Sequence, residues 1–308
     1  TQGYSSAASD VYKRQLLYQR IRARAEKGEK SILLVPEQFT SSTEGRIYRE
    51  LGDALSGMVE SFSFTSLAEK ILSTEGGAAV QTLSDAGRAV LVRRALEELQ
   101  DNVHYYHRHR RSAAFCQMAA QTIDELKSAG LSGQQLAQLA GACGAESGKL
   151  SELALIFQGY ETLLARSGMD PSDRLELAGA RLEEALARHS LPEFLRDRAV
   201  FIDEFDTFNA PKKRLLGAML AALPSVTVAL CDDGAPLLPG DLSLFSGAKQ
   251  VAAQLRQLAR KNGAEVAVPQ LLRKDLRHRN APGLAAVAEL LETCLLYTSP
   301  SPRDMRRS

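Results

Sequence analysis

The sequence predicts an α/β protein whose parallel sheet is interrupted along the chain by a block of helices, with both ends of the fold truncated. Short apolar runs alternate with segments of helical periodicity in the first part of the chain, which is typical of successive β–α–β units. Between residues 83 and 192 the apolar residues recur only at helical spacing. After Pro192 the short apolar runs return, so we expect the two outer segments to contribute strands to one sheet.

The expected strands are short, mostly apolar runs that end at proline or at polar residues. They cover residues 31–35, 59–63, 199–202, 226–230 and 265–268. The segments between them have helical periodicity and cover residues 16–27, 37–51, 66–72, 211–223 and 247–261. Gly28 ends the first of these helices, and Pro36 ends the first strand. The most apolar of the runs should be buried on both faces, as parallel strands usually are.

The block between the two outer segments consists of helices. Ser84 and Asp85 begin the first one, since serine caps helix N-termini and acidic residues are favourable in the first turn. The expected helices cover residues 84–99, 113–128, 134–140, 149–166 and 173–188. We therefore expect a helicase-like α/β domain in two parts, residues 16–82 and 193–293, with residues 83–192 inserted as a helical block.

The two ends of the chain can be encoded by complementary DNA. Residues 5–15 (SSAASDVYKRQ) can be encoded by a sequence that contains AGATGTGTATAAGAGACA. Residues 294–304 (CLLYTSPSPRD) can be encoded by a sequence that contains its reverse complement, TGTCTCTTATACACATCT. Both resemble the transposon-end adapters of sequencing libraries, and two natural tails would match in this way only by chance. We therefore expect residues 1–15 and 294–308 to be translated adapter, and the gene to continue beyond both ends.

The charge balance argues against a basic surface that covers the whole chain. The chain has 38 basic and 37 acidic residues, and the two terminal segments hold five of the basic and two of the acidic ones. Without these segments 33 basic and 35 acidic residues remain, a net charge of −2 in place of +1. Any binding of nucleic acid should therefore be local. No apolar run approaches the roughly 18 residues that span a bilayer, so we expect no membrane partner.

Three cysteines lie outside the terminal segments, Cys116, Cys143 and Cys231. They are far apart in the sequence and form no CxxC pair, which argues against a zinc site. We expect them to be buried as small apolar residues, with the protein in a reducing cytoplasm.

The most informative motif is the apolar strand at 199–202 followed by Asp203 and Glu204, the pattern of a Walker B site. An aspartate at the carboxyl edge of a parallel sheet can hold Mg²⁺, and the next glutamate can orient an attacking water. The motif therefore predicts catalytic roles for Asp203 and Glu204, with Asp203 as the metal ligand if nucleotide binds. A strand that simply runs into a polar loop would look the same, and the motif alone does not distinguish the two.

A Walker B site works together with a glycine-rich phosphate loop, G-x-x-x-x-G-K-[ST]. The sequence contains no such loop, since the tetrapeptide GEKS that begins at Gly28 lacks the upstream glycine and precedes a strand. The loop would belong directly before Leu16, where the first terminal segment ends. We therefore expect that this chain does not hydrolyse ATP, whatever the complete protein does.

Aromatic and polar residues lie at the ends of two other strands. Phe39, Phe62 and Phe64 could stack on nucleic-acid bases, although each taken singly is more typical of a core residue. The polar residues that could reach phosphates are Gln38, Thr40, Ser61 and Ser63. Asp232 and Asp233 follow a later strand and could sense bound nucleotide or lie in a surface loop.

The segment from His104 to Arg111 (HYYHRHRR) is rich in histidine, tyrosine and arginine. A solvated loop explains it best, a patch that contacts DNA or a partner is the second interpretation, and a metal site is the third. Metal binding needs fixed, neutral imidazoles with supporting partners, and no carboxylate is adjacent in the sequence.

Four strings in this order resemble the N-terminal part of the AddB (RexB) family, one of the two components of bacterial ATP-dependent helicase–nucleases. They begin at Ile32 (ILLVPEQFT), Leu83 (LSDAGR), Lys149 (KLSELALIFQGY) and Phe201 (FIDEFDTF), and the first is the most specific. The resemblance implies a helicase-like fold of the P-loop NTPase (UvrD-like) type. It also implies a protein that pairs with an AddA-type helicase–nuclease and processes DNA double-strand breaks for recombinational repair.

For the site, the resemblance places two strand ends where superfamily 1 helicases contact a single DNA strand. The implied DNA-binding residues are Gln38, Phe39, Thr40, Ser61, Phe62 and Ser63. ATP and Mg²⁺ would be ligands of the complete protein, and a nuclease domain with an iron–sulfur cluster would lie beyond this chain. Asp203 and Glu204 fall at the family's Walker B position, which is less acidic in many relatives, so the activity of the complete site stays open. We expect the fragment itself to be inactive.

Two alternatives remain. An independent superfamily 1 helicase would differ by an intact phosphate loop upstream. A non-enzymatic scaffold whose helical block only binds a partner would bind no single-stranded DNA, so salt-sensitive binding would argue against it.

Overall fold

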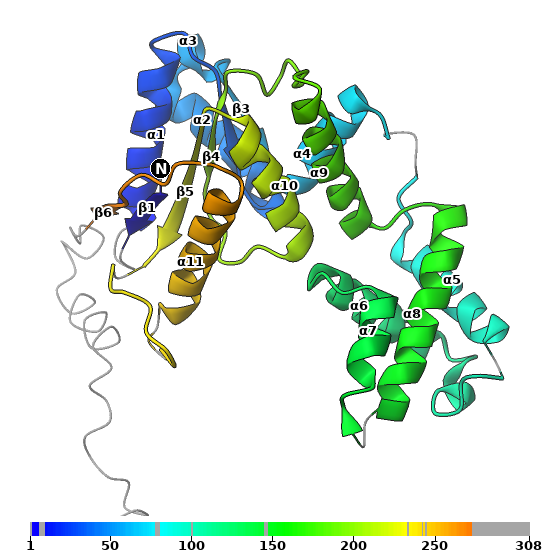
Figure 1. Ribbon diagram of the computed structural model, residues 1–308. Helices are drawn as coiled ribbons and strands as arrows, with labels where there is room; N and C mark the ends of the chain where they lie inside the picture. The colour runs from blue at the N-terminus through cyan, green and yellow to red at the C-terminus, as the bar shows by residue number, and fades with distance from the viewer. Residues whose placement is uncertain are drawn as a thin grey trace, which may run out of the picture. The chain divides into compact units, whose positions relative to one another are not determined.

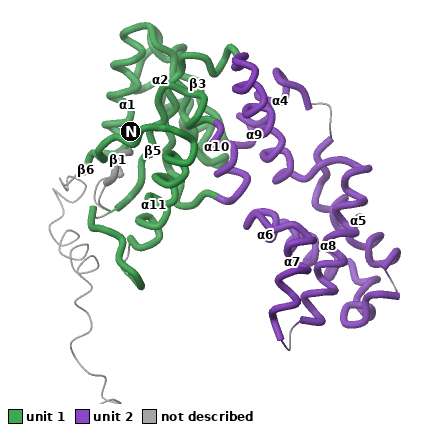
Figure 2. The backbone as a smooth tube through the Cα atoms, viewed as in Figure 1, with its two compact units in different colours: residues 1–63, 193–208, 219–308 green, residues 64–192, 209–218 purple. Residues whose placement is uncertain are grey.

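The computed structural model describes residues 2–5, 10–77, 81–99, 101–144, 147–232, 234–241, 243 and 245–272. The predicted adapter segment at 294–308 and Asp233 lie outside the described residues. The chain divides into two compact units (Figure 2). Unit 1 comprises residues 1–63, 193–208 and 219–308, and unit 2 comprises residues 64–192 and 209–218.

Unit 1 contains an all-parallel sheet, as the sequence predicted (Figure 1). Its strands are β1 (Gln2–Ser5), β2 (Ser31–Leu34), β3 (Val59–Phe62), β4 (Ala199–Ile202), β5 (Ser225–Cys231) and β6 (Gln270–Leu272). They lie in the order β3-β2-β4-β5-β1-β6, and every neighbouring pair is parallel. All residues of β2 and β4 are buried, as expected for strands that are covered on both faces.

The last strand differs from the prediction. The expected strand at 265–268 does not form, and β6 begins only after Pro269, where the chain pairs with β1. Proline has no N–H to donate to a ladder, and Val268 is 88% exposed. The apolar alternation around Val266 and Val268 therefore marked a segment that pairs with no strand among the described residues.

β1 lies inside the sheet, between β5 and β6, although the sequence assigned residues 1–15 to translated adapter. The helix α1 (Asp10–Ala25) likewise begins before Leu16, where we expected the first helix to start. Strand pairing does not bear on the coding origin of these residues, so the adapter origin stays a prediction.

Helices cover the sheet of unit 1. On one face lie α1 and α2 (Thr40–Leu51); the 3₁₀ helix η2 (Glu37–Phe39) precedes α2, and α3 (Asp53–Ser56) leads into β3. The core that they share with the strands consists of Leu17, Tyr18, Ile21, Leu33, Val35, Ile47, Leu51, Val59, Ala199, Phe201 and Ala229. Across the sheet, the β1–α1–β2 connection runs toward the β3 edge. The connection from β5 through α11 (Ser246–Lys261) to β6 runs toward the opposite edge. Right-handed crossovers therefore put α11 on the other face, and in Figure 1 it lies in front of β5.

Unit 2 is helical in its described residues. Its elements are α4 (Phe64–Glu75), α5 (Asp85–Glu98), η3 (His107–His109), α6 (Ala113–Ser128), α7 (Gly133–Ala140), α8 (Ser147–Ser167), α9 (Pro171–Ala187) and the first part of α10 (Ala210–Ala222). The helices α5 to α8 bury an apolar core around Phe157 and Tyr160. The unit begins at residue 64, whereas the sequence predicted 83, because α4 packs against α9. Glu69 of α4 and Arg174 of α9 also form an ion pair at 2.6 Å.

The structure confirms the predicted start of one helix but only part of the predicted burial of the cysteines. Ser84 caps α5 as predicted, since its Oγ accepts the N–H of Gly87 at 3.2 Å. Of the three cysteines only Cys116 is fully buried. Cys143 is exposed because it lies beyond the last turn of α7, so its predicted burial was wrong, and Cys231 is partly buried.

Within the described residues, no helix is both long and apolar enough to cross a bilayer.

Candidate functional site at the carboxyl edge of the sheet

The carboxyl ends of the central strands meet at one edge of the sheet. Leu34, the last residue of β2, is level with Phe62 of β3 and with Ile202 of β4. The segments that follow these strands therefore emerge side by side, and they contain Gln38 and Asp203 among the residues with a predicted role. Ligands of open α/β sheets bind at this edge.

Asp203 is held in place by its backbone and its neighbour. Its N–H donates to the carbonyl of Leu34 (3.0 Å), which extends the hydrogen bonding between the two strands beyond Ile202. Its side chain is buried, and Oδ1 accepts the N–H of Glu204 (2.9 Å). Glu204 has φ +66°, a left-handed conformation that is costly for a non-glycine residue and that this hydrogen bond supports. The sharp turn leaves both carboxylates at the sheet edge.

Two basic residues of α1 neutralise this acidic pair. Lys13 Nζ lies 3.0 Å from Asp203 Oδ1 and 3.8 Å from the sulfur of Cys231. Arg14 donates from Nη2 to Glu204 Oε1, and its Nε lies 4.0 Å from Asp203 Oδ2. Lys13 and Asp203 are both buried, and a buried carboxylate without such a partner would be very unfavourable.

Sequence reasoning missed Lys13, Arg14 and Tyr18 as members of this site. A signal existed, because Lys13, Leu17, Tyr18 and Ile21 recur at helical spacing and are all buried. Extending the predicted helix upstream of Leu16 would have placed Lys13 and Arg14 on it. Burial raises the pKa of Tyr18 to about 12, with Arg46 opposing this rise and Asp203 adding to it. Tyr18 is therefore a neutral neighbour of the acidic pair at physiological pH.

The donor chemistry of Asp203 and Glu204 suits Mg²⁺, which prefers carboxylate oxygens. In the structure, however, Lys13 and Arg14 engage both carboxylates. The described residues also contain no group of three histidine, cysteine or acidic side chains that could hold a metal ion. The sequence before α1 lacks the glycines of a phosphate loop. The residues present therefore do not fit a magnesium nucleotide, and no hydrolytic step follows from them.

The residues predicted to stack on a DNA strand differ in accessibility. Gln38 and Phe39, both in η2, are exposed, and Phe39 keeps 37% of its surface accessible. Phe62 is half-buried, with its ring centroid 6.4 Å from that of Phe194. Phe64 is a core residue of unit 2. Phe39 is therefore the phenylalanine best placed to contact a base.

The hydroxyl residues of the predicted set are less available. Thr40 Oγ1 donates to the carbonyl of Glu37 at 2.8 Å. Ser63 is buried, and Ser61 is partly buried with an Oγ that has no hydrogen-bond partner within the described ranges. These three side chains could reach a phosphate only after a local rearrangement.

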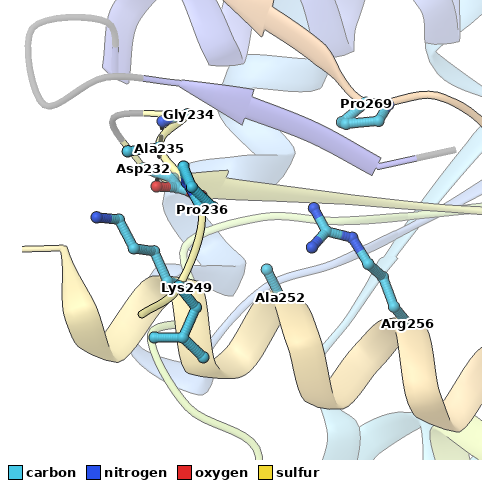
Figure 3. A pocket seen from close by; sticks show the side chains of 9 residues that line it. Asp232, Gly234, Ala235, Pro236, Lys249, Ala252, Arg256 and Pro269 are labelled. Carbon is cyan, nitrogen blue, oxygen red and sulfur yellow. Dashed lines mark hydrogen bonds between the residues drawn. The ribbon is translucent and has the colours of Figure 1, made fainter. Parts of the chain in front are cut away.

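Asp232, which follows β5, belongs to a tight turn. It is buried, and its Oδ1 accepts the N–H of Gly234 at 3.2 Å. Beside it lies a hollow of about 220 Å³ to which α11 contributes Lys249 and Arg256 (Figure 3). Lys249 Nζ lies 3.3 Å from Asp241 Oδ2, so the positive charge of Lys249 already has a partner.

A profile of the family described as "ADDB, N-terminal" matches residues 6–288. The chain belongs to this AddB family. The B-type subunit of the ATP-dependent helicase/deoxyribonuclease of Desulforudis audaxviator is 34% identical to it over 271 residues, which cover 85% of this chain and 22% of that protein.

Two further relatives of this AddB family chain carry the same name. The protein of Moorella thermoacetica is 32% identical over 277 residues, 86% of this chain and 23% of that protein. The protein of Clostridium perfringens is 29% identical over 253 residues, 81% of this chain and 21% of that protein. The AddB family chain thus spans about a fifth of the length of the curated relatives that it matches.

Proposed function

We propose that this chain is part of the AddB component of an AddAB-type ATP-dependent helicase–nuclease that processes DNA double-strand breaks for recombinational repair in the bacterial cytoplasm. Its own contribution is the binding of a DNA strand by a helicase-like α/β unit. The partner is an AddA-type helicase–nuclease subunit. ATP and Mg²⁺ act in the complete protein, and the nuclease domain and an iron–sulfur cluster lie outside this chain. The names of the relatives support this assignment.

The observation that carries the DNA-binding role is the exposed pair Gln38 and Phe39 at the carboxyl edge of the sheet. An exposed aromatic ring stacks on any base, and a glutamine can bond to base edges or to phosphate. The neighbouring carboxylates of Asp203 and Glu204 are paired with basic side chains, so they do not repel a phosphate backbone as free acids would.

Fluorescence anisotropy with a labelled oligothymidylate tests this role. Phe39→Ala should weaken binding about 5- to 150-fold, the range measured for loss of one stacked base. Tyr48→Ala is the matched control, because Tyr48 is an exposed aromatic residue on α2 of the same unit. If the wild-type chain binds and Phe39→Ala binds equally well, the sheet edge is not the site. If the wild-type chain binds no single-stranded DNA, the strand-binding role is wrong.

The intact pair Asp203 and Glu204 favours one alternative, an independent superfamily 1 helicase. That protein would show ATP hydrolysis stimulated by single-stranded DNA, and Asp203→Asn would abolish it. A chain with an intact upstream phosphate loop is needed for this assay, so the source gene should first be sequenced through both ends. Hydrolysis in a complete protein without a nuclease domain would replace the AddAB assignment.

A further inference from the structure

An aromatic hollow lies on unit 2, around the segment that the sequence singled out for its histidines and arginines. Its volume is about 430 Å³, and its lining includes Tyr105, Tyr106, His109, Phe115, Met118 and Lys149. Three of the rings pack against one another: Phe115 stacks on Tyr106 with the ring centroids 5.4 Å apart, and it lies tilted against His109 with the centroids 5.6 Å apart. Tyr105 is 57% exposed and Met118 is 58% exposed. Large apolar side chains gathered in this way at a surface are typical of a binding site.

The hollow is built on a fixed backbone. The buried carboxylate of Glu152 in α8 accepts the N–H groups of His104 (2.8 Å), Tyr105 (2.9 Å) and Tyr106 (3.3 Å). A Cβ on Gly148 would lie 2.9 Å from the ring of Tyr105, so this glycine leaves the space in which the ring packs against α8. The backbone of the aromatic hollow is therefore held in place before any ligand binds, which lowers the entropy cost of binding.

Basic residues lie in the same segment as the aromatic residues of the hollow. Arg108 and Arg111 are exposed, Arg110 is partly exposed, and Lys149 lies in the lining itself. In the part of the chain that the structure describes, no carboxylate pairs with any of these three arginines. The buried carboxylate of Glu152, which lies next to the segment, is occupied by backbone N–H groups. The surroundings of the hollow therefore suit an anionic ligand.

We propose that the aromatic hollow binds a nucleotide of single-stranded DNA, with the base stacked against Tyr105 and the flanking phosphates paired with Arg108, Arg110 and Arg111. A purely apolar ligand would leave these cations without partners, whereas single-stranded nucleic acid supplies a flat base and a charged backbone together. The volume lies within the usual range for small-ligand sites. This inference rests on the proposed strand-binding function and adds a second contact site, on the helical unit, to the one at the sheet edge.

The test uses the full chain, the labelled oligothymidylate and three variants. Tyr105→Ala should weaken binding about 5- to 150-fold, whereas Tyr105→Phe, which keeps the ring, should bind within about twofold of wild type. Arg111→Gln should reduce the slope of log affinity against log salt by about 0.7, the value expected for one phosphate contact on a single strand. Photocrosslinking with an oligonucleotide that carries iodouracil should label a peptide that includes Tyr105.

The outcomes separate this inference from the proposed function. If Phe39→Ala weakens binding but Tyr105→Ala does not, the hollow is not a DNA site and the sheet edge remains one. If Tyr105→Ala weakens binding and Phe39→Ala does not, the hollow stands and the sheet edge falls. Equal losses in Tyr105→Ala and Tyr105→Phe, with unchanged circular dichroism, would show that stacking is not the interaction.

Discussion

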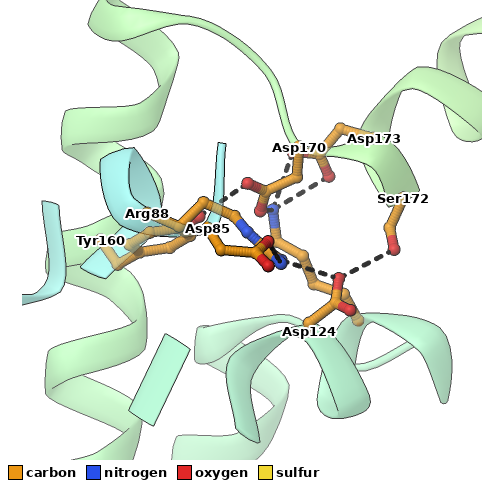
Figure 4. A network of polar contacts seen from close by, with 8 residues as sticks. Asp85, Arg88, Asp124, Tyr160, Asp170, Ser172 and Asp173 are labelled. Carbon is orange, nitrogen blue, oxygen red and sulfur yellow. Dashed lines mark hydrogen bonds and ion pairs between the residues drawn. The ribbon is translucent and has the colours of Figure 1, made fainter. Parts of the chain in front are cut away.

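Lys127 of α6 carries a largely buried positive charge between two aspartates of unit 2. Its Nζ lies 2.9 Å from Asp170 Oδ2 and 2.8 Å from Asp173 Oδ2. Asp170 is only 1% exposed, and its Oδ1 also accepts the hydroxyl of Tyr160 at 2.7 Å. Figure 4 also shows a neighbouring group of contacts, in which Asp124 forms an ion pair with Arg88 and accepts the hydroxyl of Ser172. Lys127→Met keeps most of the apolar stem and removes the charge, which leaves the buried Asp170 carboxylate with the hydroxyl of Tyr160 as its hydrogen-bond partner among the described side chains.

The cost follows from burial. Removing one partner of a buried ion pair typically costs 3–5 kcal/mol. The loss here should be near the lower end, about 3 kcal/mol, because Tyr160 still donates to Asp170. Asp173 adds little, because about a third of its side chain is exposed and water can replace the lysine. Replacing both charges, in Lys127→Met with Asp170→Asn, should cost less than the single variant, because no buried charge is then left without a partner.

Urea denaturation followed by circular dichroism measures the change in the free energy of unfolding. A chain with two compact units need not unfold in one step, so hydrogen exchange of amides in α6 and α9 should localise the loss to unit 2. Arg94→Ala is the control, since Arg94 and Glu98 form an exposed pair whose loss should cost less than about 0.5 kcal/mol. If Lys127→Met costs no more than Arg94→Ala, or if the double variant is the least stable of the set, this account of the network is wrong.

Two further predictions concern the same unit. Burial lowers the pKa of Lys127, but its contacts with Asp173 and Asp170 more than offset this effect, so the pKa of Lys127 is raised overall. The pKa of Tyr160 is also raised, by burial and then by the hydrogen bond to Asp170. A group that binds its proton more tightly in the folded state stabilises the fold fully below its unfolded pKa, which is about 10 for both residues. The urea midpoint should therefore fall as the pH rises above about 10, and these two groups should not change it at lower pH. A urea midpoint that stays constant through pH 11 would contradict the upward pKa shifts. Glu152→Gln should cost about 1.5–3 kcal/mol, the usual contribution of hydrogen bonds to a charged group, and should speed amide exchange at Tyr105 and Tyr106, whereas unchanged exchange there would show that Glu152 does not hold the loop.

Those parts of the fold that depend on local signals could be predicted from the sequence. β4 begins and ends where the apolar run 199–202 does, because a strand buried on both faces has no polar residue within it. β6 could not be placed, because its limits are set by pairing with β1, which is remote in the sequence. The start of unit 2 was missed for the same reason, since α4 joins that unit through its contact with α9.

At the candidate site, the acidic pair Asp203 and Glu204 could be found from the sequence, because the pattern of an apolar strand followed by acids is local. The basic residues that neutralise the pair were missed, because Lys13 and Arg14 lie in a segment that was set aside as adapter, and only the fold brings that segment to the end of β4. Exposure could not be predicted either. Phe39 and Phe64 follow similar strands, yet one is accessible and the other is core.

The two proposed DNA contacts present charge in opposite ways, so the proposal does not require a large positive net charge, and the chain carries only +1. At the sheet edge the carboxylates of Asp203 and Glu204 neutralise Lys13 and Arg14, so a strand there gains mainly from stacking on Phe39. At the aromatic hollow the arginines have no carboxylate partner within the described residues, so phosphates that bind there release counterions. The salt dependence of binding should therefore come mostly from the hollow. Phe39→Ala should lower affinity without changing the slope against salt, whereas Arg111→Gln should change the slope.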